Sequence, residues 1–365
     1  MTGNGVAERF PYAEETTTVT ETVFKFSDNA QIATEIKDLI EPTLIENGPG
    51  VAILVLSEGE IIHAQGYGLS DIASQTPITP NTVFDLASVS KQMTAIAVLK
   101  LMEQGALELD DPVSQYLPDF QDANRNNPIT LSHLLYHTSG LADYTGDAWD
   151  GSDREFANLD LEAHLVWLND QATIADPGTR FEYNNSGYTL LALVVERVSG
   201  QPFADFMATE IFGPIGMDDT LVYRKLGQFI PNQATGYAVT EDGQIESSSF
   251  PSVIAGDGNV FSTLNDLAHY DNALRQGTLV STATLDIAFS SGNYDDGGLI
   301  DDDGEGYGMG WQVASSYVHH SGSWLGTSTY YRHYKTPSLS IVVLSNDEAY
   351  DGEAIADEIA AKLLR

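Results

Sequence analysis

The sequence predicts an α+β protein, with an antiparallel sheet flanked by helices in one lobe and mostly helices in a second lobe. Strand-like runs lie near both ends of the chain, helix-like segments accompany them, and helical periodicity dominates the middle. We therefore expect a flexible stretch over 1–26 and a single domain over 27–365. Its sheet lobe would comprise about 27–85 and 300–365, and its helical lobe about 86–299. A ligand is expected in the cleft between the lobes.

The N-terminal part of the domain predicts a helix followed by a hairpin. Ser27-Asp28 can cap a helix in which Ile32 and Ile36 begin a series of apolar residues at helical spacing. Val51–Leu56 and Ile61–Gly66 are strand-like runs, and only four residues, one of them a glycine, separate them. That spacing favours a β-hairpin.

Periodicity also predicts the elements in the middle and in the C-terminal part of the chain. Segments of helical periodicity fill the middle: Ala95–Gln104, Leu131–His137, Leu161–Asn169, Gly187–Val198, Phe203–Phe212 and Leu264–Arg275. Three runs near the C-terminus are strand-like: Gly310–His320, Thr327–Tyr334 and Leu339–Ser345. Asp351–Arg365 then returns to helical spacing, so the C-terminal end predicts strands covered by a helix.

Charge excludes some classes of partner. The chain of 365 residues has 53 acidic and 16 basic residues, which gives a formal net charge of −37. Such a charge repels phosphate backbones and anionic membrane surfaces, so nucleic-acid binding is not expected. An acidic surface with few lysines is also typical of proteins adapted to high salt, and equally of an ordinary acidic secreted or periplasmic protein. The expected partner is a small molecule or a peptide, and the oligomeric state cannot be read from the sequence.

The sequence as written shows neither the pattern of a signal peptide nor that of a membrane span. Met1–Tyr12 lacks the basic and apolar regions of a signal peptide, and no apolar stretch of about 20 residues could span a bilayer. We therefore expect a soluble protein, secreted or periplasmic if a signal peptide has been removed and otherwise cytoplasmic. Cysteine is absent, so neither a disulfide nor a cysteine metal site can form.

The tetrapeptide Ser88-Val89-Ser90-Lys91 places a hydroxyl and an amine one helical turn apart. A serine becomes a nucleophile when a neighbouring group takes its proton. An ordinary lysine is charged at neutral pH, so this one would need surroundings that favour its neutral form. Ser90 is followed at the same spacing by Met93, which cannot take a proton. The structural alternative is a serine at a helix start followed by a solvated lysine.

Two further short motifs carry polar chemistry. Tyr183-Asn184-Asn185 precedes a helix-like segment; its tyrosine could pass a proton to a leaving group, and Asn185 could orient both a substrate and the lysine. His320-Ser321-Gly322-Ser323 closes a strand-like run, where a glycine permits close approach of a ligand. The backbone N–H groups of Ser88 and Ser323 could then bind a developing oxyanion. The alternatives are a packed loop tyrosine and a histidine exposed to water at a strand end.

In this order, S-x-x-K, Y-x-N and H-S-G resemble the penicillin-recognising serine hydrolases, which include class C β-lactamases, DD-peptidases and their esterase and aminopeptidase relatives. Ile129–Leu141, which ends in H-T-S-G-L, is similar to a stretch of this family, as are Asp111–Pro118 and Tyr307–Trp311. The resemblance covers about residues 30–365.

The resemblance implies a β-lactamase/transpeptidase-like fold, no cofactor, and a catalytic group in which Ser88 is acylated while Lys91 and Tyr183 share the proton transfers. It also implies a group that binds the substrate: Asn185, His320, Ser321, Gly322 and Ser323. His320 would supply a positive or hydrogen-bonding edge for a substrate carboxylate. Asp143 and Tyr144 either line the cleft or lie exposed in a loop, and we leave them out of the catalytic group.

The expected function is hydrolysis of amides or esters through a Ser88 acyl-enzyme, of a DD-peptidase, D-aminopeptidase or β-lactamase-related kind. Class C β-lactamases carry K-T-G where this chain has His320-Ser321-Gly322, a form more typical of DD-peptidases, D-aminopeptidases and some esterases. Efficient hydrolysis of penicillins is therefore not expected. Two alternatives remain, a short-chain carboxylesterase and a catalytically weak protein that binds or senses penicillins.

No metal site is expected. His133 and His137 have the spacing of a zinc pair, but Leu134 stands where H-E-x-x-H requires a glutamate. The acidic segment 295–305 lacks the spacing of a calcium loop, which favours a solvated loop.

Overall fold

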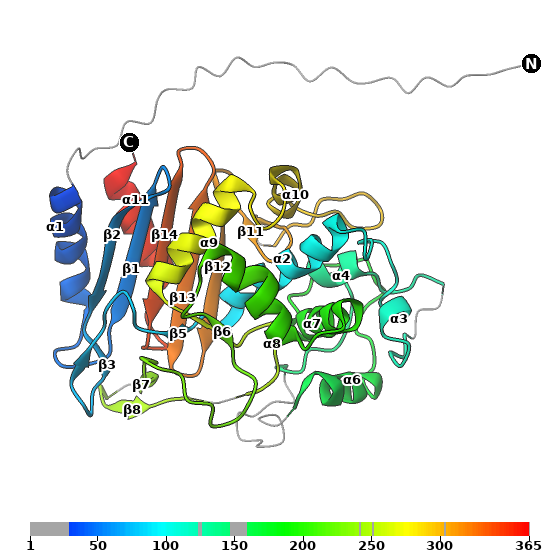
Figure 1. The fold of residues 1–365 in the computed structure, drawn as a ribbon, viewed down its shortest axis with the longest axis horizontal. Helices are drawn as coiled ribbons and strands as arrows, with labels where there is room; N and C mark the ends of the chain where they lie inside the picture. The colour runs from blue at the N-terminus through cyan, green and yellow to red at the C-terminus, as the bar shows by residue number, and fades with distance from the viewer. Residues whose placement is uncertain are drawn as a thin grey trace, which may run out of the picture.

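The computed structural model describes residues 29–122, 126–146, 159–240, 242–249, 252–302 and 304–364. The expected flexible stretch 1–26 and the capping pair Ser27-Asp28 lie outside these residues. Figure 1 shows an α+β arrangement in which a sheet occupies one part of the molecule and helices gather in the other. The predicted fold class is confirmed.

Both ends of the described chain contribute to one antiparallel sheet. Within the described residues it has seven strands in the order β10-β11-β12-β13-β14-β1-β2. Their bounds are β1 (Val51–Ser57), β2 (Glu60–Tyr67), β10 (Gly306–Tyr307), β11 (Gln312–Val313), β12 (Tyr317–Trp324), β13 (Thr327–Tyr334) and β14 (Leu339–Ser345). Strand β1 pairs with β14, with Ile53 opposite Val343, so the predicted hairpin joins the C-terminal strands.

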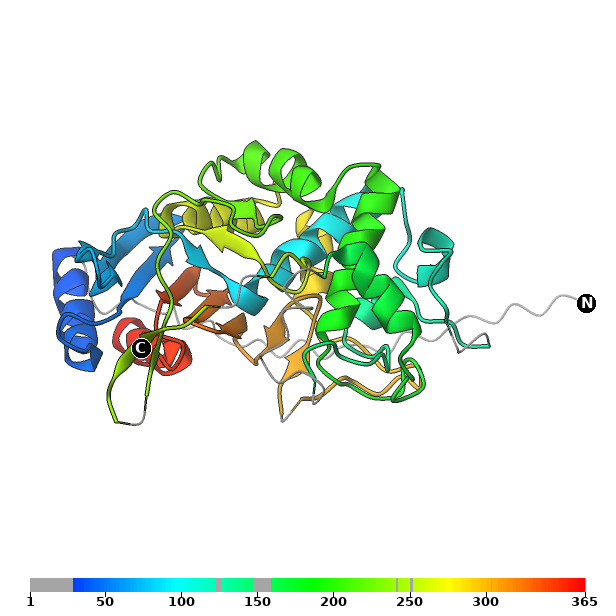
Figure 2. The same cartoon turned by 90° about the horizontal axis from the view of Figure 1, so that it is seen from below.

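Helices cover both faces of the sheet, as Figure 2 shows from below. Helices α1 (Asn29–Ile40) and α11 (Gly352–Leu363) pack on the face that contains Ile53 and Val343. The opposite face contains Leu54, and its core includes residues of α2, α7 and α9. Since successive side chains of a strand point to opposite faces, a continuous apolar run such as β1 is what a sheet covered on both faces requires.

The remaining elements of the described ranges are further helices and short strands. The other helices are η1 (Glu41–Thr43), η2 (Ala87–Val89), α2 (Ser90–Glu103), α3 (Val113–Tyr116), α4 (Leu131–Leu135), α6 (Leu161–Asn169), α7 (Asn185–Ser199), α8 (Phe203–Phe206), η3 (Met207–Phe212), η4 (Gly213–Ile215), α9 (Leu264–Gln276) and α10 (Thr282–Ala288). Among the residues that the structure describes, short strands form three small sheets: β3 (Leu69–Asp71) with β4 (Thr76–Pro77), β5 (Phe84–Asp85) and β6 (Leu221–Val222) with β9 (Val260–Ser262), and β7 (Tyr237–Val239) with β8 (Ile245–Ser247).

Three predicted elements differ from the structure. Gly310–His320 is not one strand, because the chain turns between β11 and β12, and β12 then continues through the H-S-G motif to Trp324. Leu131–His137 stops being helical at Leu135, since His137 has a φ of 56°. Phe203–Phe212 changes from an α-helix to a π-helix at Met207. None of the helices in the described ranges has the length and apolarity needed to cross a bilayer.

Candidate active site

Ser88 lies at the point where the chain passes from strand β5 into helix α2. The intervening turn, η2, contains Ala87 with a φ of 45°. This left-handed conformation is uncommon for a residue with a Cβ, and such strain persists only where the surroundings enforce it. The turn places Ser88 in the lining of a cleft of about 430 Å³.

Lys91 is fully buried beside Ser88. Its Nζ lies 3.1 Å from Ser88 Oγ, 2.8 Å from Asn185 Oδ1 and 2.8 Å from the carbonyl oxygen of Asp257. The alternative of a solvated lysine is wrong, because the side chain has no exposed surface. The three partners come from three separate segments of the chain, the turn η2, the start of helix α7 and the loop before β9, so they fix the amine at the nucleophile.

Asn185 begins helix α7 and is held by the carboxylate of Asp143. The backbone N–H of Asn185 donates to Asp143 Oδ2 (2.6 Å), and its Nδ2 donates to Asp143 (3.2 Å) and to Thr145 Oγ1 (2.8 Å). The amide oxygen is therefore left to face Lys91. Asp143 thus orients the residue that orients the lysine, and the only sequence signal for it is its place just after H-T-S-G-L.

Tyr183 presents its ring to the lysine. Lys91 Nζ is 4.9 Å from the centre of the Tyr183 ring, and the ring of His137 packs 4.4 Å from it, centre to centre. Tyr183 is 37% exposed and lines the cleft, so it is not a loop tyrosine packed only against its own helix start.

A directed chain of hydrogen bonds joins four segments of the sequence, which contain Asn184, His137, Tyr307 and His320. His137 Nδ1 accepts the N–H of Asn184 (3.0 Å), which leaves the proton on Nε2 to face the hydroxyl of Tyr307 (3.0 Å). The Tyr307 hydroxyl lies 3.1 Å from His320 Nε2, and His320 Nδ1 lies 2.6 Å from the Ser321 carbonyl oxygen. Because a carbonyl only accepts, Nδ1 of His320 carries its proton and Nε2 accepts from Tyr307.

These hydrogen bonds and the burial of the His320 side chain make His320 a neutral residue. Only 3% of His320 is exposed, so the alternative of a water-exposed strand-end histidine is wrong. Burial, with a smaller contribution from the charge of Lys91, lowers the pKa of His320 to about 3. At neutral pH the ring therefore has no positive charge to offer a substrate carboxylate, and its Nδ1–H is already used by Ser321.

Gly322 allows strand β12 to lie close to the turn that precedes Ser88. An added Cβ would lie 2.3 Å from Thr329 Oγ1 and 2.4 Å from the carbonyl oxygen of Leu86, in the turn that precedes Ser88. Thr329 Oγ1 itself donates to that carbonyl (2.8 Å). The expectation that the glycine makes room for a ligand is therefore wrong: Gly322 is buried and makes room for the nucleophile's own turn.

We expect Gly322→Ala to reduce the rate of Ser88 acylation by about 100-fold, because the methyl group would displace the Leu86 carbonyl and the turn with it. The measurement is the acylation rate with a p-nitrophenyl ester, alongside a thermal unfolding curve. Gly187→Ala is the matched control, since its Cβ would meet nothing closer than 3.6 Å. An unchanged rate in Gly322→Ala would contradict this role of the glycine.

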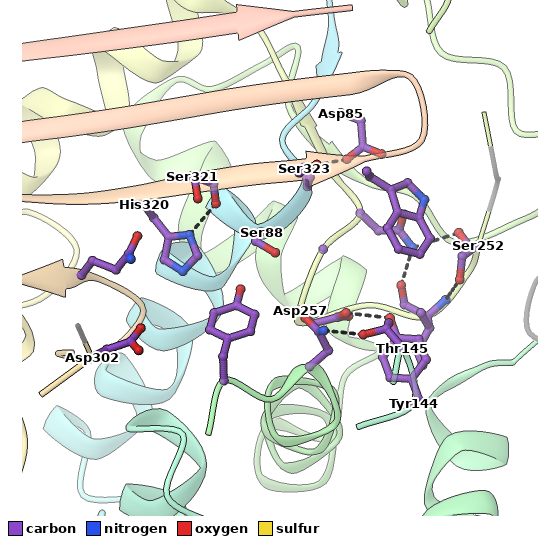
Figure 3. Close-up of a pocket in the computed structure, with 18 residues that line it drawn as sticks. Asp85, Ser88, Tyr144, Thr145, Ser252, Asp257, Asp302, His320, Ser321 and Ser323 are labelled. Carbon is purple, nitrogen blue, oxygen red and sulfur yellow. Dashed lines mark hydrogen bonds between the residues drawn. The ribbon is translucent and has the colours of Figure 1, made fainter. Parts of the chain in front are cut away.

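Figure 3 shows how the cleft is arranged around Ser88, with His320, Ser321 and Ser323 on strand β12 on one side and Asp257 on the other. Among the described residues, no lysine or arginine lines the cleft, whereas Asp85, Asp257 and Asp302 do. Tyr144, the neighbour of Asp143, donates to Asp257 Oδ2 (2.6 Å), and burial raises the pKa of that carboxyl. Asp143 and Tyr144 are thus part of the site and not an exposed loop.

The residues considered for metal binding have other partners. His133 Nε2 lies 3.1 Å from Asp295 Oδ1, whereas His137 points to Tyr307, so the pair does not share a helix face. Asp295 also accepts from Asn127 (3.0 Å). Among the described ranges, which omit residue 303 of the acidic segment, no group of three or more potential ligands is assembled.

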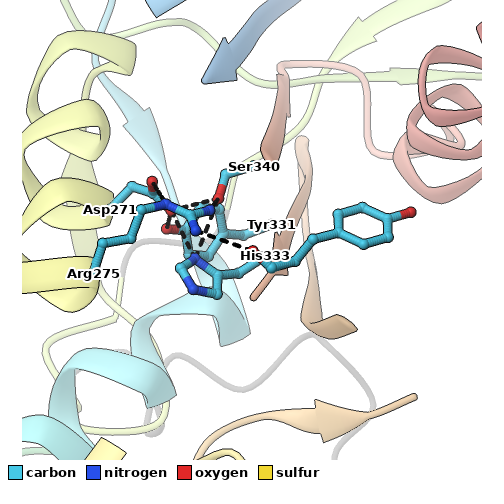
Figure 4. Close-up of polar contacts among 6 residues, drawn as sticks. Asp271, Arg275, Tyr331, His333 and Ser340 are labelled. Atoms are coloured by element: carbon cyan, nitrogen blue, oxygen red, sulfur yellow. Dashed lines mark hydrogen bonds and ion pairs between the residues drawn. The ribbon is translucent and has the colours of Figure 1, made fainter. Parts of the chain in front are cut away.

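A second buried polar group resembles a catalytic triad in composition alone. Asp271 of helix α9 lies beside His333 and Ser340 of the sheet, with Arg275 and Tyr331 (Figure 4). In a triad, serine and aspartate contact opposite nitrogens of the histidine. Here Asp271 Oδ1 (2.8 Å) and Ser340 Oγ (3.2 Å) both contact Nδ1 of His333. All but Arg275 are buried, so the group ties α9 to the sheet.

Asp271→Asn is expected to lower the free energy of unfolding by about 3 kcal/mol at pH 7, because it breaks a buried ion pair with Arg275. Burial alone would raise the pKa of Asp271, but hydrogen bonds from His333 and the charge of Arg275 lower it below its ordinary value. The stabilisation is therefore present above about pH 4 and is lost on acidification.

Denaturant unfolding of the wild type and of Asp271→Asn at several pH values measures the difference in their free energies of unfolding. Asp286→Asn, which removes an exposed carboxylate paired with Lys335, should change stability by less than about 1 kcal/mol. A difference between wild type and Asp271→Asn that grows as the pH falls below 4 would contradict the assignment.

The fold and the site together define a serine hydrolase in which a lysine adjoins the nucleophile. A family model described as Beta-lactamase matches residues 36–365, and the chain belongs to this family. The recognised superfamily is thereby confirmed.

Several relatives are similar to this chain. Penicillin-binding protein 4* of Bacillus subtilis (strain 168) is 34% identical over 316 residues, covering 81% of this chain and 68% of that protein. A D-aminopeptidase of Gluconobacter oxydans (strain 621H) is 27% identical, and the match covers 87% of this chain and only 59% of that protein. The solved structure of an octameric penicillin-binding protein homologue from Pyrococcus abyssi has a TM-score of 0.80 at 27% identity, covering 90% of this chain and 76% of that one.

Proposed function

We propose that this chain cleaves amide or ester bonds through an acyl-enzyme on Ser88, with amides and peptides of D-amino acids as preferred substrates. The observation that carries the proposal is the 3.1 Å contact between the buried Lys91 Nζ and the Oγ of Ser88, which lines the cleft. The similarity to a D-aminopeptidase supports the substrate class.

The proposed reaction begins with attack of Ser88 Oγ on the substrate carbonyl carbon. Lys91, in its amine form, takes the hydroxyl proton, while its two N–H groups remain bonded to Asn185 and Asp257. The oxyanion is bound by the backbone N–H groups of Ser88 and Ser323. Tyr183 and Lys91 return the proton to the leaving amine or alcohol, and water then releases the acyl group.

The charges of the cleft favour amidase or aminopeptidase substrates over those ending in a carboxylate. His320 is neutral, and no described residue lining the cleft is a lysine or arginine. A substrate carboxylate would therefore be desolvated without a counter-charge, which is costly. This disfavours DD-peptidase and β-lactamase substrates.

An ester is the second candidate, because Esterase EstB of Burkholderia gladioli is 33% identical over 204 residues, about half of each chain. The test is a panel containing a D-amino-acid amide, a D-Ala-D-Ala peptide, a p-nitrophenyl ester and a chromogenic cephalosporin. We expect fastest turnover of the amide. Turnover of the ester alone would favour a carboxylesterase, and acylation without turnover of any substrate would favour a sensing protein.

A further inference from the structure

A second cavity of about 160 Å³ adjoins the cleft that contains Ser88. Four residues line both spaces: Asp85, Ser252, Asn259 and Trp324. Aromatic side chains also line the second cavity: Phe84, Tyr223 and Phe261. A substrate whose acyl carbon is held at Ser88 therefore has a partly aromatic space into which its acyl group can extend.

Asp85 stands at the junction of the two spaces with little to balance its charge. Its side chain is half-buried, and among the described residues its carboxylate has one hydrogen-bond donor, the N–H of Ala87 (2.9 Å). No lysine or arginine is among the described residues that line either cavity. Burial, together with the negative charge of Asp257, raises the pKa of Asp85 to about 6. At neutral pH a mostly ionised carboxylate thus faces the junction.

We propose that the second cavity binds a protonated amine carried on the acyl group of the substrate, with Asp85 as its counter-charge. The inference rests on the proposed function, because it places the acyl group on Ser88, one short turn after Asp85. An ammonium group gains from a partly desolvated carboxylate and from nearby aromatic faces. A negatively charged acyl group would instead meet Asp85 and Asp257 together.

The test compares substrates that differ only by an ammonium in place of a methyl group. The short pair is the p-nitroanilides of D-alanine and isobutyric acid, and the long pair is the p-nitrophenyl esters of 6-aminohexanoic and heptanoic acids. In the wild type we expect kcat/KM to favour the ammonium member of at least one pair by about tenfold or more. Asp85→Asn should bring that ratio to about one, because the amide carries no charge to attract the ammonium.

Two controls separate the site from the general acidity of the protein. Glu46→Gln removes an exposed carboxylate that lines neither cavity and should leave the ratio unchanged. In Asp85→Asn the amide oxygen can still accept the Ala87 N–H, and thermal unfolding verifies that this variant folds. The inference is overturned if neither pair favours the ammonium, or if Asp85→Asn keeps the preference. Failure of the proposed function differs from both results, because neither methyl substrate would then acylate Ser88.

Discussion

Ser88→Ala is expected to reduce ester and amide hydrolysis by at least about 10⁴-fold, the size of effect seen when a covalent nucleophile is removed. The alanine leaves the strained turn at Ala87 and the burial of Lys91 in place, so the effect should lie in the chemical step. The measurement is single-turnover release of p-nitrophenol from an ester, with labelling by a fluorophosphonate followed in parallel.

The matched control is Ser323→Ala, which removes another hydroxyl from the lining of the same cleft. If Ser323 acts through its backbone N–H, as proposed for the oxyanion, loss of its hydroxyl should cost much less than loss of the Ser88 hydroxyl. Equal loss in the two variants would show that the hydroxyl of Ser88 has no special role.

Replacement of Lys91 has the second largest expected effect. Lys91→Met should slow acylation by about 10³- to 10⁴-fold, because the variant removes the group that takes the Ser88 proton. It also leaves the oxygens of Asn185 and Asp257 without their buried donor, at a cost of about 1–3 kcal/mol each in stability. Unfolding curves must therefore accompany the rate measurements.

Lys91→Arg tests whether Lys91 acts by accepting a proton from Ser88 or only through its positive charge. Arginine keeps a positive charge near Ser88 but does not give up its proton in proteins. Loss of acylation in folded Lys91→Arg would support a lysine that exchanges protons. Lys100→Met, further along the same helix and paired with Glu210, should acylate at the wild-type rate. Substantial acylation by Lys91→Arg would contradict the proposed role.

The features predicted correctly from the sequence are those that depend on local patterns. The β1–β2 hairpin follows from two apolar runs and a short glycine-containing turn, and the contact between Ser88 and Lys91 follows from their spacing of three residues. Both depend on neighbours in the sequence. The strand break before β12 was missed, because Gly310–His320 remains strand-like in composition on both sides of the turn.

The long-range contacts could not be predicted in the same way. The chain from His137 through Tyr307 to His320 joins three segments, and its hydrogen bonds depend on how the sheet meets the helices. Asp143 has no periodicity that marks it as the partner of Asn185. The charge state of His320 could not be predicted from the sequence either, because it is set by burial that only the folded chain creates.

The most direct measurement is to locate the covalent adduct formed by a fluorophosphonate or a slowly released acyl group, by peptide mass spectrometry with fragmentation. The neighbouring Ser90 is a demanding internal control: it is fully buried, and its hydroxyl accepts the N–H of Val260 (3.2 Å). We expect a single adduct on Ser88 and none on Ser90. An adduct on another residue, or turnover by folded enzyme in which Ser88 never becomes modified, would contradict it.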